Sequence, residues 1–289
     1  MPEKKLVGFA YNQLLPRAEE LVASLIDSLN LRESSWVAPA GDLQVGEEAL
    51  SSTSAVVTAG GDGTILRVAR VVAPYSVPIL GINLGRVGFM TELSVKEAES
   101  RITWYLDGSP RVEERMMVQA SVISESAGEP HVVVHALNDV VLTRGAVARL
   151  LDIDTRIDGV LLTTYRADGL IVATPTGSTG YALAAGGPIL HPEANDMLVQ
   201  PLAAHMSFQT GIVTSHDSEI QLRVVGGHQA VLSADGFTGT TVDPDHVVVI
   251  RRSPHVARFL RKAPRAAFYL SLTQRLGVSG RQVRRAPGE

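Results

Sequence analysis

A glycine turn that holds one carboxylate is the first stretch of the sequence able to do chemistry. Residues 60–63, Gly-Gly-Asp-Gly, follow an apolar run at 55–59 and precede a run with helical periodicity. Glycine lets a ligand approach the main chain. A helix starting near Thr64 points free N–H groups and its positive dipole end at the turn, which suits phosphate. Asp62 therefore puts a negative charge in a turn that is suited to bind a negatively charged ligand.

The turn alone does not identify a reaction. The sequence contains neither a Gly-x-x-x-x-Gly-Lys-Ser/Thr phosphate loop nor a Gly-x-Gly-x-x-Gly dinucleotide fingerprint. A tight strand-to-helix turn with Asp62 in solvent is an equally good reading of these residues. Other stretches must decide between the two.

Two later stretches have compositions that suit a nucleotide. Residues 81–90 form a second glycine turn, in which the backbone could approach a nucleotide while Phe89 packs against it. Residues 168–188 combine glycines with hydroxyl groups, and Tyr181 offers a flat face for a base. The hydroxyls that could donate to ribose and phosphate oxygens belong to Thr174, Thr176, Ser178 and Thr179.

The elements that must position these residues change character along the chain. Apolar periodicity predicts strands at 4–10, 56–58 and 79–83, with helices at 14–29, 64–72 and 92–106, while 36–45 is ambiguous. This alternation favours a parallel sheet covered by helices, whose ligands collect at the carboxyl ends of strands. The later β-rich runs favour a sandwich-like second domain. They lie at 112–123, 132–142, 150–157, 160–165, 170–173, 212–214, 220–225, 230–234 and 247–250.

The chain is predicted to end in a helix at 259–276 that returns to the first domain. The domains are then 1–98, completed by 262–289, and 99–261. Four cations are expected on a solvated helix end: Arg258, Arg261, Lys262 and Arg265.

Composition excludes several classes of protein. No apolar run reaches the roughly 18 residues that span a bilayer. The sequence has no cysteine, which excludes disulfides and thiol catalysis and fits a cytoplasmic location. A net charge of −4 argues against nucleic acid as a partner. His131 and His135 lack an evident third ligand, so no protein-bound metal site is predicted.

Taken together, these stretches resemble one enzyme family. Gly-Gly-Asp-Gly-Thr at 60–64 is similar to the signature of a kinase superfamily that includes NAD kinases and lipid kinases. Residues 81–90 resemble the Asn-Leu-Gly-x-x-Gly-Phe turn of NAD kinases, and 168–188 resemble that family's Thr-Pro-Thr-Gly-Ser-Thr segment throughout. Asn138 and Asp139 stand where the family has an Asn-Glu pair. The chain departs from the pattern at Asp139, Ala173, Gly180 and Ala184.

The resemblance implies phosphorylation of the adenosine ribose 2′-hydroxyl of NAD, with ATP and Mg²⁺ and with polyphosphate as an alternative donor. Asp62 is then the general base. The residues implied to contact NAD or nucleotide are Gly61, Asp62, Gly63, Thr64, Arg67, Phe89, Asn138, Asp139, Arg166, Asp168, Thr179, Gly180, Tyr181 and Ala184.

By the same resemblance Asp168 reaches a neighbouring subunit, so a homodimer or homotetramer is expected. Two other functions remain open. One is a lipid or sphingoid kinase sharing Gly-Gly-Asp-Gly-Thr, although no basic or amphipathic membrane-binding surface is evident. The other is a non-catalytic NAD(P)-binding sensor, against which the intact Asp62 argues.

Overall fold

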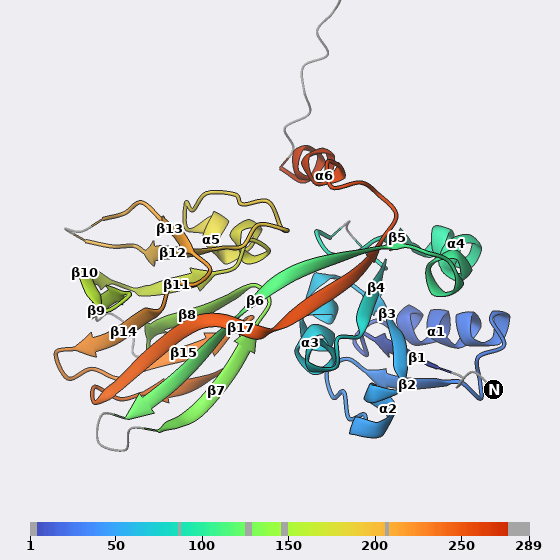
Figure 1. Cartoon of the computed structure of the whole chain (residues 1–289), viewed down its shortest axis with the longest axis horizontal. Helices are drawn as coiled ribbons and strands as arrows, with labels where there is room; N and C mark the ends of the chain where they lie inside the picture. Colours follow the sequence, from blue (N-terminus) through green and yellow to red (C-terminus); the bar gives the residue numbers. More distant parts are fainter. Residues whose placement is uncertain (1–4, 86–87, 125–128, 146–149, 206–207, 277–289) are drawn as a thin grey trace, which may run out of the picture.

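The computed structural model describes residues 5–85, 88–124, 129–145, 150–205 and 208–276. These form an α/β part and a β-rich part, which lie side by side and are joined by two long strands (Figure 1). No helix among the described residues has the length and apolar character needed to cross a membrane.

The α/β part is built on four parallel strands in the order β4-β3-β1-β2. The strands are β1 (Leu6–Tyr11), β2 (Ser35–Pro39), β3 (Thr53–Gly60) and β4 (Pro78–Asn83), and the short β5 (Leu93–Ser94) pairs with β4. The helices are α1 (Pro16–Ser28), α2 (Glu47–Ser51), α3 (Asp62–Val72) and α4 (Val95–Asp107), with a 3-10 turn at Ala73–Tyr75.

Both faces of this sheet are buried, as its β-branched strands predict. On β3, Val57 packs in a core with residues of α1 and α4, while its neighbour Val56 packs in a second core with α3. Successive side chains of a strand point to opposite faces, so one apolar run serves two cores. The carboxyl ends of β1, β3 and β4 are left free to build a site.

The β-rich part is a sandwich of two sheets. One is antiparallel in the order β13-β12-β11-β8-β15-β16, and the other contains β10-β9-β14-β17 with β6 and β7. The first has β8 (Asp139–Arg144), β11 (Gly169–Ala173), β12 (Asp196–Leu202), β13 (Ile212–Ser215), β15 (Ala230–Ala234) and β16 (Phe237–Val242). The second has β6 (Arg111–Ser124), β7 (Pro130–Ala136), β9 (Leu151–Ile157), β10 (Val160–Ala167), β14 (Ile220–Val225) and β17 (His246–Arg261). A single core lies between them, to which Val172 and Val248 contribute from opposite sheets.

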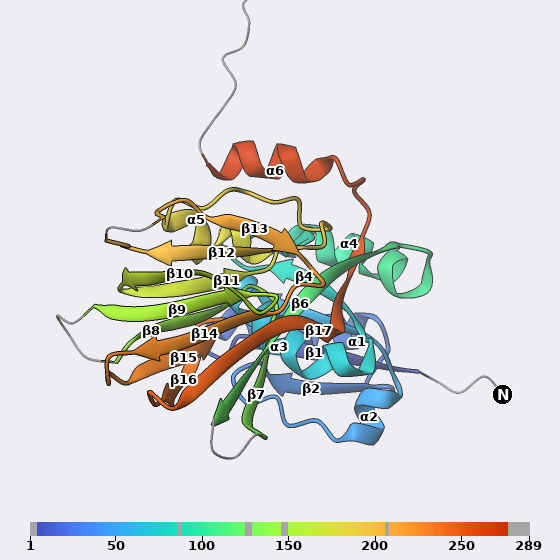
Figure 2. The ribbon, with the colours of Figure 1, turned by 60° about the vertical axis from the view of Figure 1, so that its left-hand side comes forward.

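The two parts share one sheet. β17 pairs antiparallel with β6 along nearly its whole length, and its end pairs parallel with β4 through Arg258 and Phe259. Figure 2 shows this ribbon running from the sandwich into the α/β part. An α/β domain with a parallel sheet and an antiparallel β-sandwich domain are thereby confirmed. The domain limits at 98/99 and 261/262 stay a prediction, and part of the predicted completion, 277–289, lies outside the described residues.

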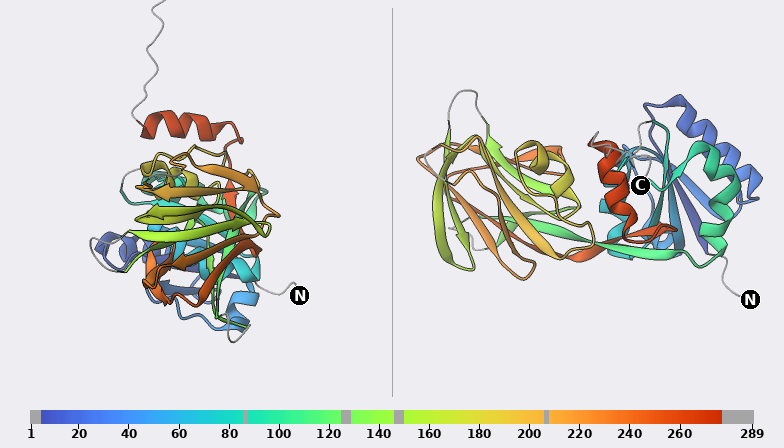
Figure 3. Two further views of the ribbon diagram at one scale, coloured as in Figure 1. Left: turned by 90° about the vertical axis from the view of Figure 1, so that its left-hand side faces the viewer. Right: turned by 90° about the horizontal axis from the view of Figure 1, so that it is seen from above.

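Helix α6 (Ala267–Arg275) ends the described chain and lies over the junction of the two parts (Figure 3). Its Arg275 stacks on Phe89 of the α/β part, with the guanidinium carbon 3.7 Å from the ring centre, so the last helix does return to the first domain. Its Phe268 ring also lies 5.2 Å from the ring of His191, which precedes the sandwich strand β12.

Several details differ from the sequence predictions. The run 132–142 is two strands, β7 and β8, because the chain bends at Leu137 and Asn138, whose amides bind Asp235. The final helix begins at 267, because β17 continues to Arg261. The ambiguous stretch contains β2, and β12 and β16 were not predicted.

Candidate active site

Asp62 is the first residue of α3, and its carboxylate reaches the loop that follows β4. The amide of Phe89 donates to Oδ2 at 2.6 Å and the amide of Met90 donates to Oδ1 at 3.0 Å. Each oxygen keeps a second acceptor position, since a carboxylate accepts about four hydrogen bonds. The side chain is therefore held in one orientation with acceptor capacity to spare.

The glycines around Asp62 have different roles. A Cβ on Gly88 would collide with the carboxylate of Asp62, so Gly88 is needed for the approach of that side chain. A Cβ on Gly61 or Gly63 would meet no described atom within 4 Å. The sequence predicted that glycines of the 81–90 turn let the backbone approach a nucleotide, but Gly88 instead makes room for the side chain of Asp62. Gly61 and Gly63 face space that a ligand can fill.

Arginines from the connecting strands hold the carbonyl side of the same loop. Arg261 Nη1 donates to Met90 O at 3.0 Å, and Arg115 Nη2 lies 3.5 Å from Phe89 O. Arg261 is only 6% exposed and lies on β17, so its predicted place on a solvated helix end is wrong. Both guanidinium groups contact Glu113. Burial raises the pKa of Glu113, but Arg115, Arg261 and Arg111 outweigh it and bring the pKa to about 2.

A cavity of about 530 Å³ opens at the N-terminus of α3. Gly61, Gly63, Thr64 and Arg67 line it from the α/β part, together with Asn12 and Gln13 after β1, and Asp235, Gly236 and Phe237 line it from the sandwich. The Arg67 guanidinium carbon lies 4.4 Å from the centre of the Phe237 ring. The cavity therefore combines a helix N-terminus with a fixed cation, which suits phosphate.

Asp235 ties the sandwich side of this cavity to Asn138 and Asp139. Its carboxylate accepts the amides of Leu137 (2.9 Å), Asn138 (2.7 Å) and Asp139 (3.3 Å). Asp235 sits at the turn between β15 and β16 with a φ of +53°. Burial, with the neighbouring Asp235 charge, raises the pKa of Asp139 to about 7. Burial also raises the pKa of Asp235, although the hydrogen bonds from the three amides act to lower it.

The hydroxyls of the 174–179 segment are turned inward. Thr174 Oγ1 donates to Leu137 O at 2.5 Å, Ser178 Oγ to Pro175 O at 2.6 Å and Thr179 Oγ1 to Thr176 O at 3.0 Å. These bonds hold the loop in shape. Thr176 Oγ1 is buried and makes no hydrogen bond within the described chain. The expectation that these four hydroxyls donate to a ligand is therefore corrected for Thr174 and Ser178, which are buried and bonded to backbone.

Most of the predicted site residues lie near one another. Gly177 packs so closely on Asn138 that a Cβ would collide with its carbonyl, and Gly180 lies near the Asn138 side-chain amide. Thr179 lies between these two glycines and therefore stands close to Asn138. Tyr181 and Ala184 are exposed on α5 (Tyr181–Ala184), which directly follows.

Arg166 and Asp168 are not near this group. Asp139 pairs with Ala173 at one end of β11, whereas Asp168 precedes Gly169 at the other end. Five extended residues separate the ends by roughly 17 Å. Asp168 pairs there with Arg144 at 3.0 Å, and Arg166 bridges to the backbone of His205. Within one chain, these two residues therefore lie at the end of β11 opposite to Asp139.

Several residues of the site were not predicted. Asn12 and Gln13 follow β1 and could have been found from the rule that ligands collect at the carboxyl ends of parallel strands. Asp235 was interpreted as a turn residue, which it is, but its bonds to a segment almost 100 residues earlier carry no local signal. Arg115 lies in β6, and no pattern in the sequence of that strand marks this arginine as buried.

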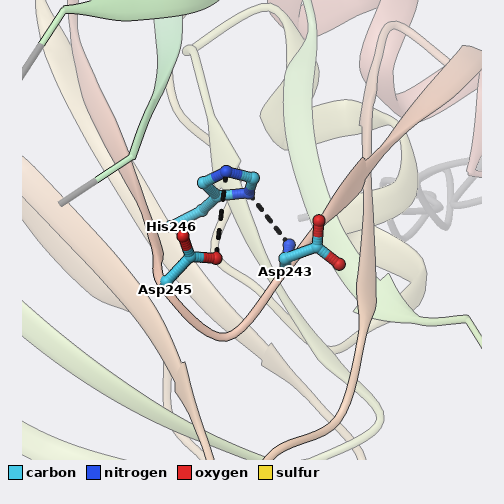
Figure 4. Close-up of side chains that lie close together, drawn as sticks. All are labelled: Asp243, Asp245 and His246. Carbon is cyan, nitrogen blue, oxygen red and sulfur yellow. Dashed lines mark hydrogen bonds and ion pairs between the residues drawn. The ribbon is translucent and has the colours of Figure 1, made fainter. Parts of the chain in front are cut away.

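One group of side chains has a composition that could hold a metal. Asp243, Asp245 and His246 lie together in the turn before β17, with ligand atoms within 4.8 Å of one another (Figure 4). However, His246 Nδ1 accepts the backbone N–H of Asp243 at 3.0 Å. Because Nδ1 accepts this bond, a neutral ring carries its proton on Nε2, which lies 4.0 Å from Asp245 Oδ1 and has no lone pair for a metal. The group is therefore explained as a structural turn.

Comparison with known proteins places the chain in a family. Residues 13–109 match the ATP-NAD kinase N-terminal domain, and residues 137–262 match the ATP-NAD kinase C-terminal domain. The NAD kinase of Dehalococcoides mccartyi strain CBDB1 is 38% identical over 282 residues, covering 96% of this chain and 98% of the relative. The chain belongs to the NAD kinase family.

Other members are similar over nearly as much of the chain. The NAD kinase of Heliobacterium modesticaldum is 35% identical, covering 91% of this chain and 95% of the relative. A crystal structure of an NAD kinase from Archaeoglobus fulgidus in complex with ATP superposes with a TM-score of 0.73 at 28% identity, covering 95% of this chain and 99% of that one. A yeast NADH kinase complexed with NADH shares the fold, with a TM-score of 0.81 at 23% identity and coverage of 97% and 90%.

As a member of this family the chain is an enzyme, a phosphotransferase that phosphorylates NAD with ATP. The comparisons support neither a lipid kinase nor a non-catalytic sensor.

Proposed function

We propose that the γ-phosphoryl group of ATP is transferred to the 2′-hydroxyl of the adenosine ribose of NAD, with Asp62 as the general base. The bond from the 2′-oxygen to phosphorus forms, the bond from the β,γ-bridging oxygen to phosphorus breaks, and the hydroxyl proton passes to Asp62. The products are NADP and ADP. Phosphoryl transfer depends on positioning and charge neutralisation, with a group to take the nucleophile's proton.

The observation that carries this proposal is the anchored carboxylate of Asp62. Two consecutive amides, of Phe89 and Met90, fix its oxygens, yet each oxygen can accept one more hydrogen bond. Gly61 and Gly63 beside it face open space among the described residues. A base must be within hydrogen-bond reach of the proton it takes, and the free acceptor positions of Asp62 support that role.

The donor phosphates fit the cavity at the start of α3. The first turn of that helix supplies a positive dipole end, and Arg67 supplies a cation held against Phe237. Mg²⁺ would enter with ATP and neutralise charge on its phosphates. Asn12, Gln13 and Asp235 line the same cavity, but their side-chain oxygens accept backbone amides. Mg²⁺ would therefore be held mainly by the phosphates and water, since it keeps several waters.

NAD fits the side of the site formed by Phe89 and the sandwich. Asn138 and Asp139 are held by Asp235 where they can meet sugar hydroxyls, and Thr179, Gly180, Tyr181 and Ala184 continue the same surface. Tyr181 is 49% exposed, which leaves its ring free to meet a base.

Arg166 and Asp168 support a site shared between two subunits. They lie at the far end of β11 from Asp139, so they would contact NAD only in a neighbouring copy. A homodimer or homotetramer is proposed on this ground. Polyphosphate as an alternative donor and a cytoplasmic location remain predictions from the sequence.

A coupled assay tests the proposed reaction. The purified chain is incubated with NAD, ATP and MgCl₂, and NADP is detected with an NADP-specific dehydrogenase, with ATP omitted or replaced by polyphosphate in parallel. NADP that appears only with a phosphoryl donor supports the proposal. ATP consumption without NADP, or no reaction at all with NAD, contradicts it.

A further inference from the structure

Arg275, the last residue of α6, lies beside the Asp62 loop although it is more than 200 positions away in sequence. Its guanidinium carbon lies 3.7 Å from the centre of the Phe89 ring, and the amide of that same Phe89 anchors Asp62. The electrostatic attraction of Asp62 acts on Arg275. The helix that crosses the junction of the two parts therefore carries a cation to the general base.

This cation has unused hydrogen-bond donors. Its Nε and Nη1 atoms are buried, and neither bonds to any atom of the described chain. A guanidinium has five N–H groups, and leaving a buried one unsatisfied destabilises the protein. Burial lowers the pKa of Arg275 to about 10, and the negative charge of Asp62 limits this decrease. The guanidinium therefore remains charged at neutral pH.

The neighbouring arginines show that Arg275 differs from a structural cation. Arg115 and Arg261 both pair with Glu113 and also bind loop carbonyls. Arg275 lines the same cavity of about 250 Å³ beneath α6, yet forms no ion pair within the described chain. Five arginines line this cavity, and Arg275 is the one that has no carboxylate partner among the described residues; the other four, Arg111, Arg115, Arg261 and Arg265, pair with Glu113 or Glu193.

We propose that Arg275 binds a phosphoryl oxygen next to Asp62 and is a substrate-binding residue of this enzyme. The inference rests on the proposed function. A guanidinium binds phosphate through short, charge-assisted and often paired hydrogen bonds, and stacking on Phe89 holds its plane in place. The phosphoryl group belongs either to ATP or to the pyrophosphate of NAD, and kinetics distinguish the two.

The test compares Arg275→Met with Gln274→Met, an exposed neighbour on the same helix. Steady-state kinetics are measured with ATP varied and then with NAD varied. We expect Arg275→Met to lower kcat/KM about 10- to 100-fold for the substrate whose phosphate Arg275 contacts, and Gln274→Met to change it less than about 2-fold. Arg275→Lys, which keeps the charge but not the fork, should recover part of the loss.

A fall in the ATP arm assigns the contact to the donor, and a fall in the NAD arm assigns it to the acceptor. Unchanged kcat/KM in both arms overturns the proposal. So does an increase in the NAD arm, which would mean that Arg275 merely covers the face of Phe89. If Arg275→Met does not fold, Arg275→Lys decides: equal kcat/KM with the wild type in both arms rejects a paired phosphate contact.

Binding separates this proposal from the reaction itself. Calorimetry measures ATP and NAD binding to Asp62→Asn, with and without Arg275→Met. If the wild type forms no NADP, the proposed reaction fails. Weaker binding of one nucleotide in the double variant would still support a phosphate contact at Arg275, and equal binding of both would reject it.

Discussion

Gly88 and Asp62 are in direct contact: any Cβ on Gly88 would overlap the carboxylate of Asp62. The proposed general base is therefore in direct contact with the loop that follows β4. Two stretches that are separate motifs in the sequence are joined by this close approach and by the hydrogen bonds from the amides of Phe89 and Met90 to Asp62.

Replacing Gly88 with alanine should displace Asp62. The methyl group must push the carboxylate away from the amides of Phe89 and Met90. Because displacing a catalytic group by about 1 Å can lower the rate about 10²-fold, we expect the rate of NADP formation to fall at least about 10-fold. Gly85→Ala is the matched control, because a Cβ there would meet no described atom within 4 Å. Equal loss in both variants would contradict a specific contact.

Asp62→Asn should remove the proton acceptor while keeping the side chain's shape. We expect kcat to fall about 10²- to 10⁴-fold. NAD binding, measured by calorimetry, should persist because the proposed NAD contacts lie on Phe89 and the sandwich. An Asn variant that turns over at the wild-type rate would remove Asp62 from the role of base.

The sequence predicted the elements better than their contacts. The alternation of β3, α3 and β4 is local and follows from apolar periodicity, and the turn that carries Asp62 lies where a parallel sheet places ligands. The amides of 137–139 bind Asp235, and Arg261 is buried against Glu113. In both cases the partners are about 100 or more positions apart in the sequence. No local pattern reports such pairings, so Arg261 was misplaced and the role of Asp235 was missed.

Asp139 should make stability depend on pH. Its folded pKa of about 7 lies above the ordinary 3.8, so the folded chain keeps a proton that the unfolded chain has released. The stability it contributes is full below about pH 4 and is lost as pH rises through about 7. In urea unfolding from pH 5 to pH 8, Asp139→Asn should gain stability relative to wild type as pH rises, and the exposed Asp107→Asn should not. A constant difference would contradict the raised pKa.

Arg261 should contribute strongly to stability. Arg261→Met leaves Glu113 and Glu92 with fewer partners in a buried place, and we expect a loss of about 3–5 kcal/mol in the free energy of unfolding. Arg258→Met removes a more exposed pair with Glu114 on the same strand and should cost at most about 1 kcal/mol. Denaturant titration checks both values, and similar losses would argue against a special role for Arg261.

Co-expression tests whether Asp168 acts across subunits. Asp62→Asn and Asp168→Ala should each be poorly active alone. In a mixed dimer one site combines both substitutions and the other has neither, so a statistical mixture should restore about a quarter of the wild-type sites. If the mixed sample is no more active than its parents, Asp168 does not serve a neighbouring copy.

β17 also has a consequence for synthesis on the ribosome. The parallel sheet of the α/β part is complete only when Arg258 and Phe259 pair with β4, so most of the chain must be translated first. Until then one side of β4 presents unpaired backbone groups, the kind of edge to which other nascent chains adhere. A chain that terminates before Arg258 would therefore keep an unpaired edge on β4, and we expect the need for chaperones to last until Arg258 and Phe259 have been made.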